Sequence, residues 1–151
     1  MKLRLINPSK EKQDPLFASM EVLQLLESYS GYYAKIGFAP PWAAYLIIVD
    51  DKPVGTCSFG GEPKDGQVEI SYWTFRDFEG QGIASLACEA LVSIANEEMP
   101  GITVVAKTEP EHNASTRILQ KNGFIHSKVV QDDDIGDAWL WVLKNQESVK
   151  T

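Results

Sequence analysis

The segment Trp73-Thr-Phe-Arg-Asp-Phe-Glu-Gly-Gln-Gly-Ile-Ala84 most constrains the fold, because it leads from a strand through a glycine turn into a helix. Gly80 and Gly82 have no Cβ, so the backbone here can adopt positive φ and approach a ligand closely. The first N–H groups of the helix have no partner within it, and the positive end of the helix dipole lies behind them. Such a turn favours a phosphate or pyrophosphate. The alternative is an ordinary strand-to-helix turn, because short glycine motifs often match by chance.

Composition indicates one globular domain over residues 1–151 and argues against several classes of partner. The chain is 44% hydrophobic and 10% aromatic, which is enough to form a core. Its formal net charge is −7 and it has no run of Lys and Arg, so we expect neither nucleic acid nor a membrane as a partner. It has no long apolar stretch, and its N-terminus lacks the apolar region of a signal peptide. We therefore expect a cytoplasmic protein.

Cysteine and histidine are too few and too widely spaced to predict a metal site. Cys57 and Cys88 do not form a CxxC motif, and His112 and His126 match no known ligand spacing with them. Both cysteines fall at apolar positions of predicted elements. We expect them to be reduced thiols of the core.

The first half of the chain predicts a helix followed by a meander of strands. Asp14-Pro15 is typical of a helix start, and apolar residues recur at helical spacing up to Ser30-Gly31. A short strand over residues 3–6 precedes this helix, and an aromatic loop over residues 32–42 follows it. Strands are then expected over three ranges: 44–49, 54–59 and 68–75.

A crossover from strand to helix to strand links the two halves. An apolar stripe from Ile83 to Ile94 predicts a helix, and the β-branched run over residues 102–106 predicts a strand buried on both faces. Because a helix separates the strands at 68–75 and 102–106, we expect these two strands to be parallel.

The C-terminal part adds a short helix and a hairpin. Asn113 is expected to cap a helix that runs through Lys121, and the strands over 124–130 and 138–143 are expected to pair. Together the elements predict a single-domain α+β fold with a mixed, twisted sheet and helices on its faces.

The glycine turn and the strand before it resemble the acyl-CoA-binding segment of the GNAT N-acetyltransferases. The family signature at this turn is Arg/Gln-x-x-Gly-x-Gly/Ala. Gly82 and Ala84 match it, whereas Glu79 stands where the family usually has Arg or Gln. The departure removes a charge contact to the ligand, but such a turn binds mainly through backbone N–H groups.

A second block, Pro110–Phe124, resembles the Asn…Ser…Leu-x-Lys-x-Gly-Phe helix of the branch that includes ribosomal-protein N-terminal acetyltransferases. A third, weaker block comprises residues 40–46, 54–55 and 60–61. The resemblance covers roughly residues 36–143. It implies a GNAT-like sheet of about seven strands with helices on both faces. It also implies an acetyl-CoA-dependent N-acetyltransferase, in which a primary amine attacks acetyl-CoA directly in a ternary complex.

The resemblance further implies which residues contact acetyl-CoA. The backbone of Trp73, Thr74 and Phe75 would hydrogen-bond the pantetheine and lend an N–H to the oxyanion of the tetrahedral intermediate. Asn113 would hold the pantetheine arm or only cap its own helix, and the two roles are compatible. The pyrophosphate would lie on backbone N–H groups of the glycine turn: Gly80, Gln81, Gly82, Ile83, Ala84 and Ser85.

Two side chains are candidates for proton handling. Many family members use a Tyr on the late helix as the acid for the departing thiolate. Leu119 stands at that place here, and a Tyr in its position would restore the acid if the helix face has room. Ser115 stands where this branch carries a Ser, so it either hydrogen-bonds the thiolate or only supports the helix start. Glu69 is the candidate base for the incoming ammonium or else an exposed strand residue. His112 and Glu62 are weaker candidates.

Four residues from the middle of the chain are expected to line the acceptor side of the active-site cleft. They are Phe38, Trp42, Phe59 and Gly60. Aromatic residues in such loops also serve packing. The negative net charge favours a cationic acceptor, such as a peptide N-terminus or another small amine, but selects nothing in detail. We expect a monomer or homodimer.

Two other functions stay open at this stage. A non-catalytic acyl-CoA-binding module is compatible with the absence of the helix Tyr. A dinucleotide-binding fold is disfavoured, because Ser85 stands where a third glycine is needed and the preceding strand lies in an antiparallel meander.

Overall fold

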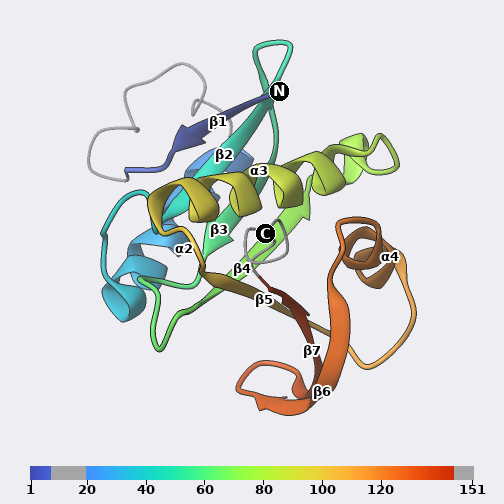
Figure 1. Cartoon of the computed structure of the whole chain (residues 1–151). Helices are drawn as coiled ribbons and strands as arrows, with labels where there is room; N and C mark the ends of the chain where they lie inside the picture. The colour runs from blue at the N-terminus through green and yellow to red at the C-terminus, as the bar shows by residue number, and fades with distance from the viewer. Residues whose placement is uncertain (8–19, 145–151) are drawn as a thin grey trace.

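The computed structural model describes residues 1–7 and 20–144, which form one seven-stranded sheet and the helices packed on it (Figure 1). The strands are β1 (Lys2–Leu5), β2 (Ala44–Val49), β3 (Lys52–Phe59), β4 (Gln67–Thr74), β5 (Thr103–Thr108), β6 (Ile125–Asp132) and β7 (Gly136–Leu143). The helices are α2 (Met20–Ile36), α3 (Ile83–Glu98) and α4 (Ala114–Lys121), and a short 3₁₀ turn η2 (Arg76–Phe78) follows β4. The expected α+β fold is confirmed.

In the middle of the sheet, the neighbouring strands β4 and β5 pair over only part of their length. Its strand order is β1-β2-β3-β4-β5-β7-β6, and β4 pairs with β5 in parallel, as the crossover through α3 requires. Their ladder extends only from Gln67↔Thr103 to Glu69↔Val105. Because β4 continues to Thr74, its C-terminal half presents an unpaired edge towards the β5 side.

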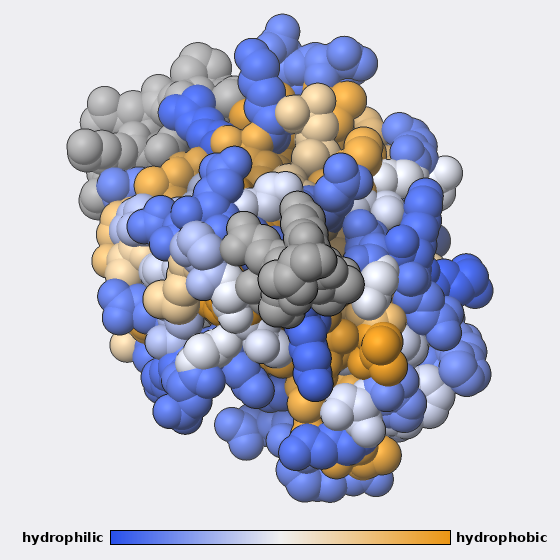
Figure 2. Space-filling model, viewed as in Figure 1, coloured by the Kyte–Doolittle hydropathy of each residue, from blue (hydrophilic) through white to orange (hydrophobic). Residues whose placement is uncertain are grey.

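Two hydrophobic cores lie on opposite faces of the sheet. Ile47 of β2 packs in the core that includes Leu91 of α3. Its neighbour Leu46 packs in a second core with Tyr33 of α2. Successive side chains of a strand point to opposite faces, so α2 and α3 cover opposite faces of the sheet. On the face that Figure 2 shows, hydrophilic side chains cover most of the surface, and hydrophobic areas lie between them.

Both cysteines lie in the core beneath α3, as predicted. Cys57 and Cys88 are buried and free. Burial raises the pKa of each thiol to about 12. The thiols are therefore protonated at neutral pH and act as small apolar core residues.

Helix α2 ends later than the sequence indicates. The Ser30-Gly31 pair predicts the helix end, but α2 continues to Ile36. Its last turns carry tyrosines whose rings contact one another: Tyr29, Tyr32 and Tyr33. The Tyr33 hydroxyl donates to the carbonyl of Ile6, 2.8 Å away. Tertiary packing thus outweighs the low helix propensity of glycine. The predicted start at Asp14-Pro15 lies outside the described residues.

Candidate active site

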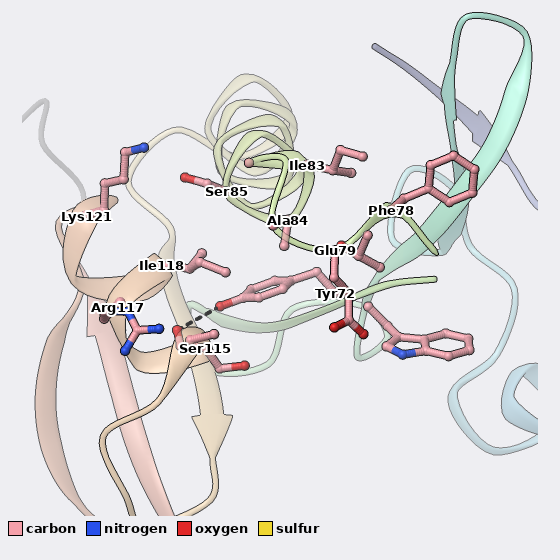
Figure 3. A pocket seen from close by; sticks show the side chains of 15 residues that line it. Tyr72, Phe78, Glu79, Ile83, Ala84, Ser85, Ser115, Arg117, Ile118 and Lys121 are labelled. Carbon is pink, nitrogen blue, oxygen red and sulfur yellow. Dashed lines mark hydrogen bonds between the residues drawn. The ribbon is translucent and has the colours of Figure 1, made fainter. Parts of the chain in front are cut away.

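A cavity of about 570 Å³ lies between the end of β4, the N-terminus of α3 and the helix α4 (Figure 3). It is lined by Tyr72, Trp73, Thr74, Phe78, Glu79, Gly80, Gly82, Ile83, Ala84, Ser85, Ala114, Ser115, Arg117, Ile118 and Lys121. The cavity therefore brings together the glycine turn and the helix of the second sequence block, as the sequence predicts.

The glycine turn has the backbone that the sequence indicates. Gly80 and Gly82 have φ of 79° and 78°, and a Cβ at either position would meet no atom within 4 Å. Gly82 is the N-cap of α3, and no side chain caps the helix. The first N–H to bond within the helix is that of Leu86, which donates to the Gly82 carbonyl. The N–H groups of the first turn are therefore available to an anion.

Helix α4 begins with a capping box. The Asn113 side-chain oxygen accepts from the Thr116 N–H at 3.1 Å, and the Asn113 N–H donates to the Thr116 hydroxyl at 2.9 Å. The predicted N-cap role of Asn113 is confirmed. Neither Asn113 nor Gln81 is among the residues that line the cavity, so their contacts to a cofactor stay predictions.

Ser115 faces the cavity from the first turn of α4. Its hydroxyl donates to no atom of residues 1–7 and 20–144, whereas its carbonyl accepts from the Tyr72 hydroxyl at 3.4 Å (Figure 3). Because Asn113 and Thr116 make the capping bonds, the Ser115 hydroxyl is not needed for the helix start. This arrangement favours a chemical role for Ser115.

Leu119 leaves no place for a tyrosine. Its side chain is fully buried and belongs to the core beneath α3. A larger ring there would overpack the core instead of reaching the cavity. The helix face therefore lacks the room that a Tyr at this position would need to restore the acid.

The main chain of β4 directs alternate residues to the open edge. The Phe75 N–H donates to the Val54 carbonyl at 2.8 Å, and the Glu69 carbonyl accepts from Gly60 at the same distance. Because neighbouring residues of a strand direct their N–H and C=O groups to opposite sides, Tyr72 and Thr74 face the open edge. The prediction for Thr74 fits this geometry. Phe75 does not fit, because its N–H is used within the sheet and its side chain is buried.

Trp73 lines the cavity, but its main chain does not face the open edge of β4. Its backbone lies on the β3 side, opposite the expected contact with pantetheine, as the strand alternation requires. Its indole lines the cavity, is 51% exposed and contacts the ring of Phe75 edge-on. An indole offers a large apolar surface and an N–H donor, so Trp73 is a candidate contact for a ligand in the cavity.

Glu69 lies in a second cavity, of about 450 Å³, together with Gly60 and Glu62. Its carboxylate is 3.5 Å from the Lys107 ammonium, which is also 3.4 Å from a carboxylate oxygen of Asp132. Burial lowers the pKa of Lys107, but the charges of Glu69 and Asp132 raise it more, so it lies above its ordinary value. Glu69 is therefore part of an ion-pair network and does not share a cavity with Ser115.

Two of the predicted acceptor residues are core residues instead. Trp42 is 7% exposed and Phe59 is fully buried, and their rings pack edge-on at 5.1 Å. Aromatic residues near glycines look accessible in sequence, but here they fill the space between sheet and helix. Phe38 is 44% exposed and packs on Tyr33, so it stays a candidate. His112 packs against Trp139 and lines neither cavity.

Charged residues of the cavity complement an anion, although the sequence does not single out all of them. Arg117 and Lys121 lie one turn apart on α4 and both line the cavity, where Glu79 is the opposing acidic residue. Asn122 donates to the Ser85 hydroxyl at 3.2 Å, which holds the end of α4 beside the first turn of α3. The i,i+4 spacing of Arg117 and Lys121 is the signal that could have indicated a shared face.

Among residues 1–7 and 20–144, no three His, Cys, Asp or Glu side chains are grouped so that they could hold a metal ion. No helix of the same residues is long and apolar enough to cross a membrane.

Residues 7–125 match the family described as "Acetyltransferase (GNAT) domain". The chain belongs to this family. A ribosomal-protein-serine acetyltransferase of Escherichia coli K12 is 32% identical over 97 residues, 63% of this chain and 54% of that protein. The N-acetyltransferase p20 of Bacillus licheniformis is 30% identical over 111 residues, 68% of this chain and 62% of that protein. The chain thus spans 54% and 62% of the length of these two curated relatives.

Solved structures confirm the GNAT fold. The ribosomal L7/L12 alpha-N-protein acetyltransferase RimL, solved in complex with coenzyme A, superposes with a TM-score of 0.68 at 21% identity. The match covers 95% of this chain and 93% of that one. A ribosomal-protein-alanine N-acetyltransferase of Brucella melitensis has a TM-score of 0.66 at 15% identity, over 95% and 99% of the two chains.

Proposed function

We propose that this GNAT protein is an acetyl-CoA-dependent N-acetyltransferase that acts on a primary amine by direct attack. The observation that carries the proposal is the cavity that joins the glycine turn of α3, the open edge of β4 and Ser115 of α4. The cavity thus contains an anion site at the glycine turn, then the hydrogen-bonding groups of the open edge of β4, and then the hydroxyl of Ser115. A long ligand with a phosphate end and a reactive end fits this order.

In this proposal acetyl-CoA spans the cavity. Its pyrophosphate lies on the N–H groups at the start of α3, where Gly82 lets the ligand approach. The pantetheine lies along the open edge of β4, and Tyr72 and Thr74 offer it their main-chain groups. The thioester then lies near the end of the β4–β5 ladder, between Tyr72 and Ser115.

The residues around the thioester would act on three groups. A main-chain N–H of the open edge of β4 stabilises the oxyanion of the tetrahedral intermediate. The Ser115 hydroxyl donates to the departing sulfur. Glu69 is the last residue of the β4–β5 ladder and lines the second cavity, and we assign it the proton of the incoming ammonium.

The acceptor is proposed to be a protein or peptide amine. The printed names of relatives, a ribosomal-protein-serine acetyltransferase among them, support a protein acceptor. The second cavity is lined by Glu69, which would attract an ammonium group, and by the exposed Gly60. Phe38 and the indole of Trp73 are the exposed aromatic side chains proposed to contact the acceptor.

Release of free thiol from acetyl-CoA in the presence of an amine library tests this function. The library should contain peptides with different N-terminal residues, aminoglycosides and polyamines. We expect release above the hydrolysis blank with at least one peptide. Acetyl-CoA binding without thiol release for any amine would favour the non-catalytic acyl-CoA-binding module.

Opposite charges in the cavity should have opposite effects on acetyl-CoA affinity. We expect Lys121→Ala to raise KM for acetyl-CoA by roughly threefold to tenfold, less than the full value of a hydrogen bond to a charged group, because Lys121 is exposed. Glu79→Gln should lower KM, because it removes a negative charge from the phosphate end of the cavity. Steady-state kinetics at low and moderate salt measure both effects, and salt should weaken them.

Lys52→Ala is the matched control, because Lys52 begins β3 at an exposed position and lines neither cavity. It removes the same charge without touching the proposed phosphate site. Equal effects of Lys121→Ala and Lys52→Ala would contradict the assignment of Lys121.

A further inference from the structure

The side chain of Tyr72 extends from β4 across the cavity to α4. On the same face of β4, Val68 and Ile70 are buried beneath α3 at 3% and 2% exposure. Tyr72 is next in this row, but it lies beside the cavity and is only half-buried. Its hydroxyl lies 3.4 Å from the carbonyl oxygen of Ser115 (Figure 3). The phenol therefore lies beside the residue that faces the departing sulfur.

The proposed path of acetyl-CoA leads past this hydroxyl. The phosphates bind at the start of α3, and the pantetheine follows the open edge of β4 towards the end of its ladder with β5. The main-chain groups of Tyr72 point to that edge, and its phenol lies beside the cavity. A thioester that reaches this point lies between β4 and the first turn of α4, within reach of both hydroxyls.

The phenol is suited to stabilise an anion as a hydrogen-bond donor. Burial, with a smaller contribution from Cys88, raises the pKa of Tyr72 well above its ordinary value, so the hydroxyl is protonated at neutral pH. Its present bond to the Ser115 carbonyl is long, and a neutral carbonyl is a weaker acceptor than a thiolate. The phenol can therefore donate to a nearby sulfur with little loss.

We propose that the Tyr72 hydroxyl donates a hydrogen bond to the departing thiolate of coenzyme A, alongside Ser115. The inference rests on the proposed function. The amine nitrogen forms a bond to the carbonyl carbon, the C–S bond breaks, and its electron pair goes to the sulfur. Tyr72 and Ser115 keep their protons. The proton lost by the amine goes to Glu69 or water and later neutralises the thiolate. Tyr72 of β4 thus donates the hydrogen bond that a tyrosine in place of Leu119 on α4 could not donate.

Tyr72→Phe tests the proposal by turnover and by the bound product. We expect kcat to fall roughly tenfold to a hundredfold, the value of one hydrogen bond to a charged group, with little change in KM for acetyl-CoA. The ultraviolet absorbance of the thiolate measures the thiol pKa of bound coenzyme A. In Tyr72→Phe that pKa should rise by about one unit or more, because one pKa unit corresponds to a tenfold change in equilibrium.

Tyr45→Phe is the matched control. The Tyr45 hydroxyl donates to the Pro41 carbonyl at 2.6 Å, away from the cavity, and its side chain is buried. This variant should leave kcat and the bound thiol pKa unchanged. A monofluorinated tyrosine in place of Tyr72 keeps the ring and strengthens the donor, so it should lower the bound thiol pKa.

The outcomes separate this inference from the proposed function. If acetyl-CoA stabilises Tyr72→Phe as it does the wild type, but kcat and the bound thiol pKa are unchanged, the assignment of Tyr72 is overturned and the function stands. A fluorinated tyrosine that leaves the thiol pKa unmoved overturns it as well. If acetyl-CoA does not stabilise even the wild type, the proposed function fails and this inference fails with it.

Discussion

Gly82→Glu is expected to abolish the rise in melting temperature that acetyl-CoA causes in the wild type. Gly82 has φ of 78° and lines the cavity, and its Cβ position is open. The new carboxylate would lie beside the N–H groups proposed to hold the pyrophosphate, so it would both fill the site and repel the ligand. A ligand at a hundred times its Kd stabilises the folded state by about 2.7 kcal/mol, and the variant should lose all of this. Thermal melts with and without acetyl-CoA measure it.

Two variants separate ligand exclusion from backbone strain. Gly136→Glu introduces the same charge at a glycine with φ of 76° and equally open surroundings, at the first residue of β7. It should lower the melting temperature of the free protein and keep the response to acetyl-CoA. Gly82→Ala adds the strain of a Cβ without the charge and should keep part of the response. A full response in Gly82→Glu would exclude this turn as the phosphate site.

Ser115→Ala is expected to lower kcat roughly tenfold to a few hundredfold while KM for acetyl-CoA changes little. A hydrogen bond to a departing thiolate acts mainly in the transition state, and one bond to a charged group contributes about 1.5–3 kcal/mol. The melting temperature should not fall, because Asn113 and Thr116 make the capping bonds of α4 and alanine favours a helix. Steady-state kinetics and a melting curve measure the two effects.

Thr116→Ala is the neighbouring control with the opposite expected result. Thr116 is fully buried, and its hydroxyl accepts from the Asn113 N–H in the capping box. Its removal should cost about 1 kcal/mol of stability and leave kcat close to that of the wild type. Ser115→Ala with normal turnover and a lowered melting temperature would instead make Ser115 a structural residue.

Features that depend on neighbouring residues could be predicted from sequence. Gly80 and Gly82 mark a turn of positive φ, and Asn113 marks a helix start, because each requirement acts within a few residues. The parallel pairing of β4 and β5 also follows from sequence, since a connecting helix must return the chain in the same direction. The family resemblance rests on these same local motifs.

Accessibility could not be predicted in the same way. Phe59 and Trp42 flank glycine and proline residues, which suggests surface loops, yet both pack in the core. Phe75 follows the residues of the open edge, yet its N–H bonds to β3. Burial and the direction of a main-chain group depend on which elements come together, and these elements are distant in the chain.

The sequence by itself determined the glycine turn of α3, the parallel crossover and the capped start of α4, because local backbone preferences and chain direction are sufficient for each. Only the tertiary structure decided that Tyr72 meets Ser115, 43 residues further along the chain, and that Glu69 binds Lys107 in a separate cavity. It also decided that Leu119 is buried. These facts depend on how β4, β5 and α4 pack together, and no periodicity or spacing within a single element carries that information.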